Sequence, residues 1–290
     1  MNIAFDATAI LGPMSKNRGI GNYAFELFKT MIASDTKNQY FFLNFIEEYS
    51  LTAQLDHPGN VHDCFFYTGE NHFLIDDAQY RPIIGDIIRN FIDEYQIDVF
   101  FVTSPFESTV VTYEKEWFEN TKVVAIVYDI IPYVMKEQYL TSKEIYRWYM
   151  ERVEMLRWME RCLVISQSVK DDMVKHLNFD PEKIDVIYGA TSGKFFKTTL
   201  SDEQKNEILS KFNIGDRFIM CLGGDDKRKN MDALITAYAK MPRELIDNYQ
   251  LVIVCRLSKE TLNRLLTLSR ENGVSGRVVC TNFVTDEELL

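Results

Sequence analysis

Three cations follow a pair of glycines in the second half of the chain. An apolar run ends at Gly223 and Gly224 in the stretch LGGDDKRKN. The cations of KRK, among them Arg228 and Lys229, come next and lead into a helical pattern that starts near Asn230. Glycines let a ligand approach the backbone, cations neutralise its charge, and a helix N-terminus attracts anions. The stretch therefore predicts a diphosphate site, with a solvated basic loop as the alternative, and it lacks the G-x-x-x-x-G-K-[ST] spacing of a Walker A loop.

A second glycine-rich stretch, RGIGNYA, lies near the N-terminus. Gly19, Gly21 and Ala24 fit G-x-G-x-x-G/A, the pattern that holds the pyrophosphate of a dinucleotide at the start of a helix. In a dinucleotide fold the first glycine directly follows the first strand, whereas here LGPMSKNR intervenes after the strand ends near Thr8. The spacing favours a longer loop that delivers backbone N–H groups to an anion at the helix N-terminus. A turn that merely needs glycine is an equally weighted alternative.

Further polar side chains follow apolar runs or interrupt an apolar helix face. Tyr128 and Asp129 end the run KVVAIVYD, and open α/β sheets bind ligands beyond the carboxyl ends of their strands. Asp129 suits a helix cap or loop equally well. Ser166 follows RCLVI, and either it or Ser168 is expected to cap the next helix, with a ligand role for Ser166 only in addition. Arg152 falls inside the apolar face of a helical pattern at 142–160, so it either pairs with a buried acid or points into a cleft.

The elements that would position these residues alternate along the chain. Short apolar runs predict strands at 2–8, 39–46, 62–68, 98–104, 122–129, 161–166, 183–189, 217–224, 249–255 and 277–283. Amphipathic patterns predict helices at 20–33, 80–95, 142–160, 167–177, 201–212, 230–240 and 258–272, with another starting at 285. Continuous apolar strands separated by helices predict an α/β fold with parallel sheets covered on both faces.

The stretch GATSGKFFKTTLS, 189–201, has the small and polar residues of a linker. It divides the chain into an N-terminal domain, 1–189, and a C-terminal domain, 190–290. The second domain has three predicted strands, whereas a doubly wound domain usually has five or six, so we expect it to be incomplete in a truncated or shortened chain.

Composition limits the classes of function. The formal net charge of −11 over 290 residues argues against nucleic-acid binding, and the 46 % hydrophobic content is that of a soluble globular protein. Five scattered cysteines without a C-x-x-C motif favour reduced thiols in the cytoplasm over a zinc site. No apolar run approaches the length of a membrane span, and the N-terminus lacks the basic segment of a signal peptide.

Together these stretches resemble family 4 of the retaining glycosyltransferases, which have the GT-B fold of two Rossmann-like doubly wound parallel sheets. The resemblance covers essentially the whole chain as an ordered set of motifs. RGIGNYAFEL is similar to the glycine loop and first helix of the family, and VYDIIPYVMKEQYL to its H-D-L-I-P segment. LVISQSVKDDMVKHLNFDPEKIDVIYGA is similar to its S-x-x-S-K…V-I-P-N-G run, LGGDDKRKN to its G-G-x-x-x-R-K-N, and VTDEELL to the stretch before its donor-binding helices.

The resemblance implies transfer of a sugar, with retained configuration, from a nucleotide-diphosphate donor to a glycan, polysaccharide or lipid-linked sugar acceptor. It implies no cofactor and no metal, and the chain contains no D-x-D motif. It also implies that Lys229 and Arg228 hold the donor diphosphate and that Gly19 and Gly21 close over it. Tyr128 and Asp129 are the candidate catalytic residues. Further residues expected on the ligand side are Arg152, Ser166, Gly223, Gly224 and Asn230.

The chain departs from the family pattern in several places. The family often has histidine where Tyr128 stands and asparagine at the position of Tyr188, and many members have arginine at the position of Gly224. The E-x7-E segment that contacts the donor sugar in the family would lie beyond residue 290. A catalytically inactive, truncated GT-B module that binds a glycan or a partner is therefore the alternative, and an NAD-binding oxidoreductase is the least favoured. Acceptor, oligomeric state and peripheral contact with the inner face of the membrane are left open.

Overall fold

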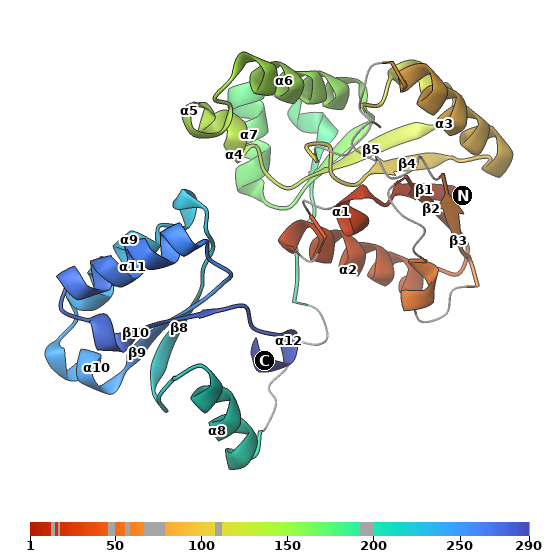
Figure 1. Cartoon of the computed structure of the whole chain (residues 1–290). Helices are drawn as coiled ribbons and strands as arrows, with labels where there is room; N and C mark the ends of the chain where they lie inside the picture. The colour runs from red at the N-terminus through yellow and green to blue at the C-terminus, as the bar shows by residue number, and fades with distance from the viewer. Residues whose placement is uncertain are drawn as a thin grey trace. The chain divides into compact units, whose positions relative to one another are not determined.

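The computed structural model describes residues 1–12, 15–16, 18–45, 50–55, 59–66, 79–107, 112–191 and 200–289. They form two compact units, Met1–Ala190 and Thr191–Leu290 (Figure 1). Both units are layered α/β structures built on parallel sheets, and the predicted fold class is confirmed.

The first unit is built on a seven-stranded parallel sheet in the order β3-β2-β1-β4-β5-β6-β7. Its strands are β1 (Asn2–Asp6), β2 (Gln39–Asn44), β3 (Val61–Phe65), β4 (Val99–Val102), β5 (Lys122–Val127), β6 (Arg161–Val164) and β7 (Ile184–Val186). The strand order reverses between β1 and β4, which pair in parallel. In doubly wound sheets such a reversal opens a crevice beyond the carboxyl ends of the two strands, where ligands bind. The residues that follow β1 and β4 are therefore candidates for a binding site.

Helices cover both faces of this sheet (Figure 1). They are α1 (Thr8–Leu11), α2 (Gly19–Ser34), α3 (Arg81–Tyr95), α4 (Ile131–Val134), α5 (Lys136–Tyr139), α6 (Lys143–Trp158) and α7 (Gln167–Leu177). The sheet has a hydrophobic core on each face, and successive residues of a strand point into different cores. Phe5 packs with Phe28 of α2 in one core, whereas Ala4 belongs to the core formed with α3, α6 and α7. Buried side chains on both faces explain why the strands are continuous apolar runs.

The second unit contains a three-stranded parallel sheet in the order β10-β9-β8. Its elements are α8 (Asp202–Lys211), β8 (Phe218–Leu222), α9 (Met231–Ala239), α10 (Arg243–Asn248), β9 (Gln250–Val254), α11 (Lys259–Glu271), β10 (Val278–Asn282) and α12 (Asp286–Leu289). Helices α9, α10 and α11 pack on one face of the sheet. Residues of α8 and α12 line a hollow of about 200 Å³ over the other face.

All ten predicted strands are present, and each long helical pattern forms a helix. The predicted strands extend too far at their C-terminal ends, because polar residues such as Thr103, Tyr128 and Asp129 lie in the loops that follow. The one-turn helices α1, α4 and α5 are too short for periodicity to reveal. Among the described residues no helix is long and apolar enough to cross a membrane.

Candidate functional site

The glycine pair and the cations of the second unit lie in the loop between β8 and α9. A Cβ atom on Gly223 would lie 2.8 Å from Sγ of Cys255 and 3.1 Å from Sδ of Met231, so this glycine is required by packing. A Cβ atom on Gly224 would lie 3.3 Å from Cγ of Lys229, which places the aliphatic stem of that lysine over the glycine. The loop is therefore folded back on itself, with Lys229 exposed to solvent.

The cations form a single 3-10 turn, Lys227–Lys229, in front of α9. Asp226 caps this turn: its carboxylate accepts from the backbone N–H of Arg228 at 3.0 Å and from Nε of Arg228 at 3.0 Å. Asn230 follows in the left-handed conformation, with φ of 50°, and makes no side-chain cap to α9. An exposed cationic turn thus precedes an uncapped helix N-terminus, and both features favour an anion.

A neighbouring acid holds this loop in place. The carboxylate of Asp225 accepts from the backbone N–H of Ser258 at 3.2 Å and from its hydroxyl at 3.3 Å. A hydrogen bond from Thr261, with smaller contributions from Ser258 and Arg264, lowers the pKa of Asp225. Ser258 is the N-cap of α11, so the loops after β8 and β9 are tied together at the carboxyl edge of the sheet.

In the first unit the two glycines of RGIG differ in their surroundings. Gly19 is the first residue of α2, is exposed, and would place a Cβ atom in open space. Gly21 is buried, and a Cβ atom there would lie 2.7 Å from the carbonyl oxygen of Ser15 and 2.9 Å from that of Ala9. Gly21 is thus required by close packing, whereas only Gly19 is open to a ligand.

Tyr128 and Asp129 follow β5, as predicted. Tyr128 is buried, donates its hydroxyl to the carbonyl oxygen of Thr103 at 3.1 Å, and contacts the ring of Tyr23 edge-on at 5.6 Å. Burial raises the pKa of Tyr128 well above its usual range, so this hydroxyl stays protonated. Asp129 accepts from the backbone N–H of Ile131 at 3.0 Å. Both side chains thus have structural partners, and their catalytic assignment stays a prediction.

Ser166, one of the two serines expected to cap this helix, is the N-cap of α7. Its hydroxyl oxygen accepts from the backbone N–H of Val169 at 3.3 Å. We expect Ser166→Ala to lower the free energy of unfolding by about 1 kcal/mol, since it removes an N-cap acceptor. Urea unfolding would measure this loss, and Ser166→Asp, which keeps a capping oxygen, should retain most of the stability. Equal losses in the two variants would contradict the capping role.

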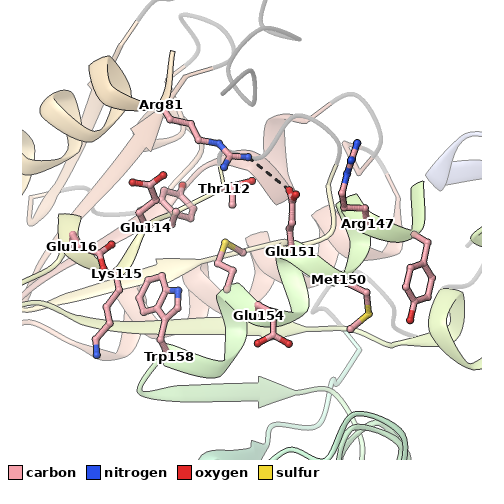
Figure 2. Close-up of a pocket in the computed structure, with 13 residues that line it drawn as sticks. Arg81, Thr112, Glu114, Lys115, Glu116, Arg147, Met150, Glu151, Glu154 and Trp158 are labelled. Atoms are coloured by element: carbon pink, nitrogen blue, oxygen red, sulfur yellow. Dashed lines mark ion pairs between the residues drawn. The ribbon is translucent and has the colours of Figure 1, made fainter. Parts of the chain in front are cut away.

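Arg152 is fully buried on α6. Its guanidinium donates to Oγ1 of Thr112 at 2.8 Å and lies over the ring of Trp148 at 4.6 Å. Thr112 also lines a hollow of about 750 Å³ beside α6, where Arg81 and Glu151 form an ion pair at 3.9 Å (Figure 2). Arg152 lies inside the domain core next to this hollow, so its assignment to the ligand side stays a prediction.

The sequence patterns did not single out a buried polar cluster where the strand order reverses. Asp6 ends β1, is fully buried, and accepts from the backbone N–H of Thr103 at 3.1 Å and from the hydroxyl of Tyr113 at 3.1 Å. Desolvation by burial raises the pKa of Asp6 to about 6. Glu107, which is 5 % exposed, accepts from the hydroxyl of Ser15 at 2.7 Å. The sequence offered one signal for this cluster, a polar residue directly after an apolar run, such as the threonine of DVFFVTS. That signal does not show which residues come together in the fold.

Among the described residues, the N-terminus of α2 in the first unit and the cationic turn in the second have groups suited to an anion. Among the described residues no group of three or more His, Cys, Asp or Glu side chains could hold a metal ion. The cationic turn of the second unit has the groups that can bind a diphosphate and stabilise negative charge on it, namely cations beside a helix N-terminus.

Comparison with known proteins identifies the family of this chain. Residues 18–191, more than half of the chain, match the model of Glycosyltransferase Family 4. The serotype-specific mannosyltransferase WbdA of Escherichia coli is 29 % identical over 170 residues, which cover 58 % of this chain and 21 % of WbdA. The O-antigen chain mannosyltransferase RfbU of Salmonella typhimurium is 28 % identical over 150 residues, or 48 % of this chain and 37 % of RfbU. The chain thus spans about a fifth of the length of WbdA.

Solved structures share the fold at low identity. Anabaena Alr3699/HepE in complex with UDP and glucose matches with a TM-score of 0.67 at 15 % identity, over 99 % of this chain and 71 % of that one. Sucrose-phosphate synthase from Thermosynechococcus elongatus matches with a TM-score of 0.67 at 15 % identity, over 100 % of this chain and 72 % of that one. The fold is GT-B, and the resemblance found in the sequence motifs is confirmed. By the match over residues 18–191, this chain belongs to Glycosyltransferase Family 4.

Proposed function

We propose that this protein transfers a sugar from a nucleotide-diphosphate donor to a glycan or polysaccharide acceptor, with retained configuration and without a metal or cofactor. The exposed cationic turn before α9 carries the proposal. Lys229 and Arg228 bind the donor diphosphate through their charges. In the first unit, the exposed N-terminus of α2 offers N–H groups of the kind that bind phosphate oxygens.

The chemistry follows from where charge develops. As the bond between the sugar and the diphosphate breaks, negative charge accumulates on the leaving diphosphate oxygens. Fixed cations and N–H groups stabilise that charge more in the transition state than in the bound donor, which accelerates the reaction. A lysine and an arginine here supply the positive charge that a divalent metal supplies in other sites.

The acceptor proposal rests on the relatives. WbdA and RfbU are named as mannosyltransferases, and RfbU as acting on an O-antigen chain. We therefore propose a surface polysaccharide, or a lipid-linked precursor of one, as the acceptor class.

Lys229→Ala tests the proposed site. We expect UDP or GDP to bind the 290-residue chain in calorimetry and Lys229→Ala to weaken binding about tenfold or more, because it removes a charge-assisted hydrogen bond. Lys240→Ala is the matched control, since it removes the same charge from the opposite end of α9. Equal affinity of Lys229→Ala and Lys240→Ala would show that the site is assigned wrongly.

Turnover separates a transferase from a binding module. A UDP- or GDP-sugar with a polysaccharide acceptor should release the nucleoside diphosphate, and Lys229→Ala should slow that release. Saturable binding of a glycan or a protein without release of nucleoside diphosphate would instead support the inactive module that binds a glycan or a partner.

A further inference from the structure

Two loops meet where the strand order reverses in the first unit. The loop after β1 leads to α2, and the loop after β4 lies against it. The hydroxyl of Thr103 accepts from the backbone N–H of Ala9 at 3.0 Å, and the carboxylate of Glu107 accepts from the hydroxyl of Ser15 at 2.7 Å. The loop after β4 therefore holds the loop after β1 at two points.

The two residues that are held, Ala9 and Ser15, pack against Gly21 in the first turn of α2. The carbonyl oxygens of Ala9 and Ser15 lie 2.9 and 2.7 Å from the place of a Cβ atom on Gly21. The carbonyl of Ser15 also accepts from the backbone N–H of Arg18, the N-cap of α2, at 2.9 Å. A shift of Ser15 would therefore displace the first turn of α2.

Glu107 is placed to resist such a shift. Its side chain is buried, and Ser15 is fully buried. A Cβ atom on Gly12 would lie 3.4 Å from Cγ and from Oε1 of Glu107, so the carboxylate lies directly against the loop backbone. Removing one partner of a buried hydrogen bond leaves the other partner in a dry environment without that bond, which costs more than the net worth of the bond itself.

We propose that Glu107 is a positioning residue for the glycine loop. By fixing Ser15, it sets the position of Arg18, Gly19 and Gly21 and so the direction in which the first N–H groups of α2 point. The proposal rests on the proposed function in one respect, because it identifies the donor diphosphate as the anion that those N–H groups bind.

The test compares Glu107→Ala, Glu107→Gln and Ser15→Ala in the 290-residue chain. Hydrogen exchange of the backbone amides of Arg18 and Asn22, which donate to the carbonyl oxygens of Ser15 and Arg18 at 2.9 Å, reports the order of the loop directly. We expect exchange there to rise about tenfold in Glu107→Ala and Ser15→Ala, since each removes one partner of a buried hydrogen bond, while β4 and β5 stay protected. Glu107→Gln keeps an acceptor oxygen and should restore most of the protection. Glu116→Ala, an exposed carboxylate close by in the chain, is the matched control.

Affinity for UDP or GDP is the second readout, and it should fall in Glu107→Ala and Ser15→Ala but not in Glu107→Gln. Unchanged exchange of the Arg18 and Asn22 amides in Ser15→Ala would overturn the positioning role. Equal increases of that exchange in Glu107→Gln and Glu107→Ala would overturn it as well. If the unaltered chain binds neither nucleotide, the proposed function fails, whereas the exchange measurement still decides whether Glu107 orders the loop.

Discussion

Replacing Gly21 by alanine should lower the free energy of unfolding by about 3 kcal/mol, whereas the same change at Gly19 should alter it by less than about 0.5 kcal/mol. A Cβ atom on Gly21 would meet two carbonyl oxygens within 3 Å, and backbone atoms cannot move aside as the end of a flexible side chain can. At Gly19 no described atom, apart from its chain neighbours and the backbone of its own helix, lies within 4 Å of the Cβ position. Urea unfolding of both variants measures the difference.

The same pair of variants separates packing from ligand binding. Gly19→Ala should keep its stability yet bind UDP or GDP more weakly, because the methyl group narrows the approach to the helix N-terminus. Equal stability of the two variants would contradict the packing at Gly21. Unchanged nucleotide affinity in Gly19→Ala would count against a phosphate contact at α2.

Asp6→Asn should remove a pH dependence of stability between about pH 4 and pH 6. The pKa of Asp6 is raised from 3.8 to about 6, so in this window the folded state binds a proton that the unfolded state has lost. Stability therefore falls as pH rises through the window, by about 3 kcal/mol at 1.36 kcal/mol for each pKa unit. The neutral amide of the asparagine variant does not titrate. The free energy of unfolding of the variant should therefore rise relative to that of the unaltered protein between pH 4 and pH 6, and the difference should be constant above pH 6.

Urea unfolding of both proteins from pH 4 to pH 8 measures this difference. Asp35→Asn is the control: the hydrogen bond from Tyr40 and others lower the pKa of Asp35 to about 2, so Asp35 is ionised in both states above pH 5. Its effect on stability should therefore be the same at every pH from 5 to 8. A difference between the Asp6 variant and the unaltered protein that does not change from pH 4 to pH 6 would show that Asp6 is not titrating in a buried site.

Several elements were predictable because their signals are local. The strands are short apolar runs, and Ser166 and Asp129 lie three and two residues from the N–H groups that they accept from. The cationic turn was predictable for the same reason, since Gly223, Gly224 and Lys229 lie within one loop. The second sheet has three strands in the described residues, as expected.

The buried cluster was not predictable, because its partners are far apart in the sequence. Ser15 and Glu107 are separated by 92 residues, and Asp6 and Thr103 by 97. They meet only because β4 pairs with β1, which depends on the strand order of the whole sheet. Likewise, periodicity placed Arg152 on an apolar face, but its burial beside Thr112 depends on the packing of α6.

The amino-acid sequence by itself determined the alternation of strands and helices, the family and the cationic turn, because each depends on residue types within a short span. Only the tertiary structure showed that Gly21 is required by packing, that Gly19 is open, and that Glu107 accepts a hydrogen bond from Ser15. The physical reason is that steric contact and burial depend on distance in space, which the chain order of a doubly wound sheet does not preserve.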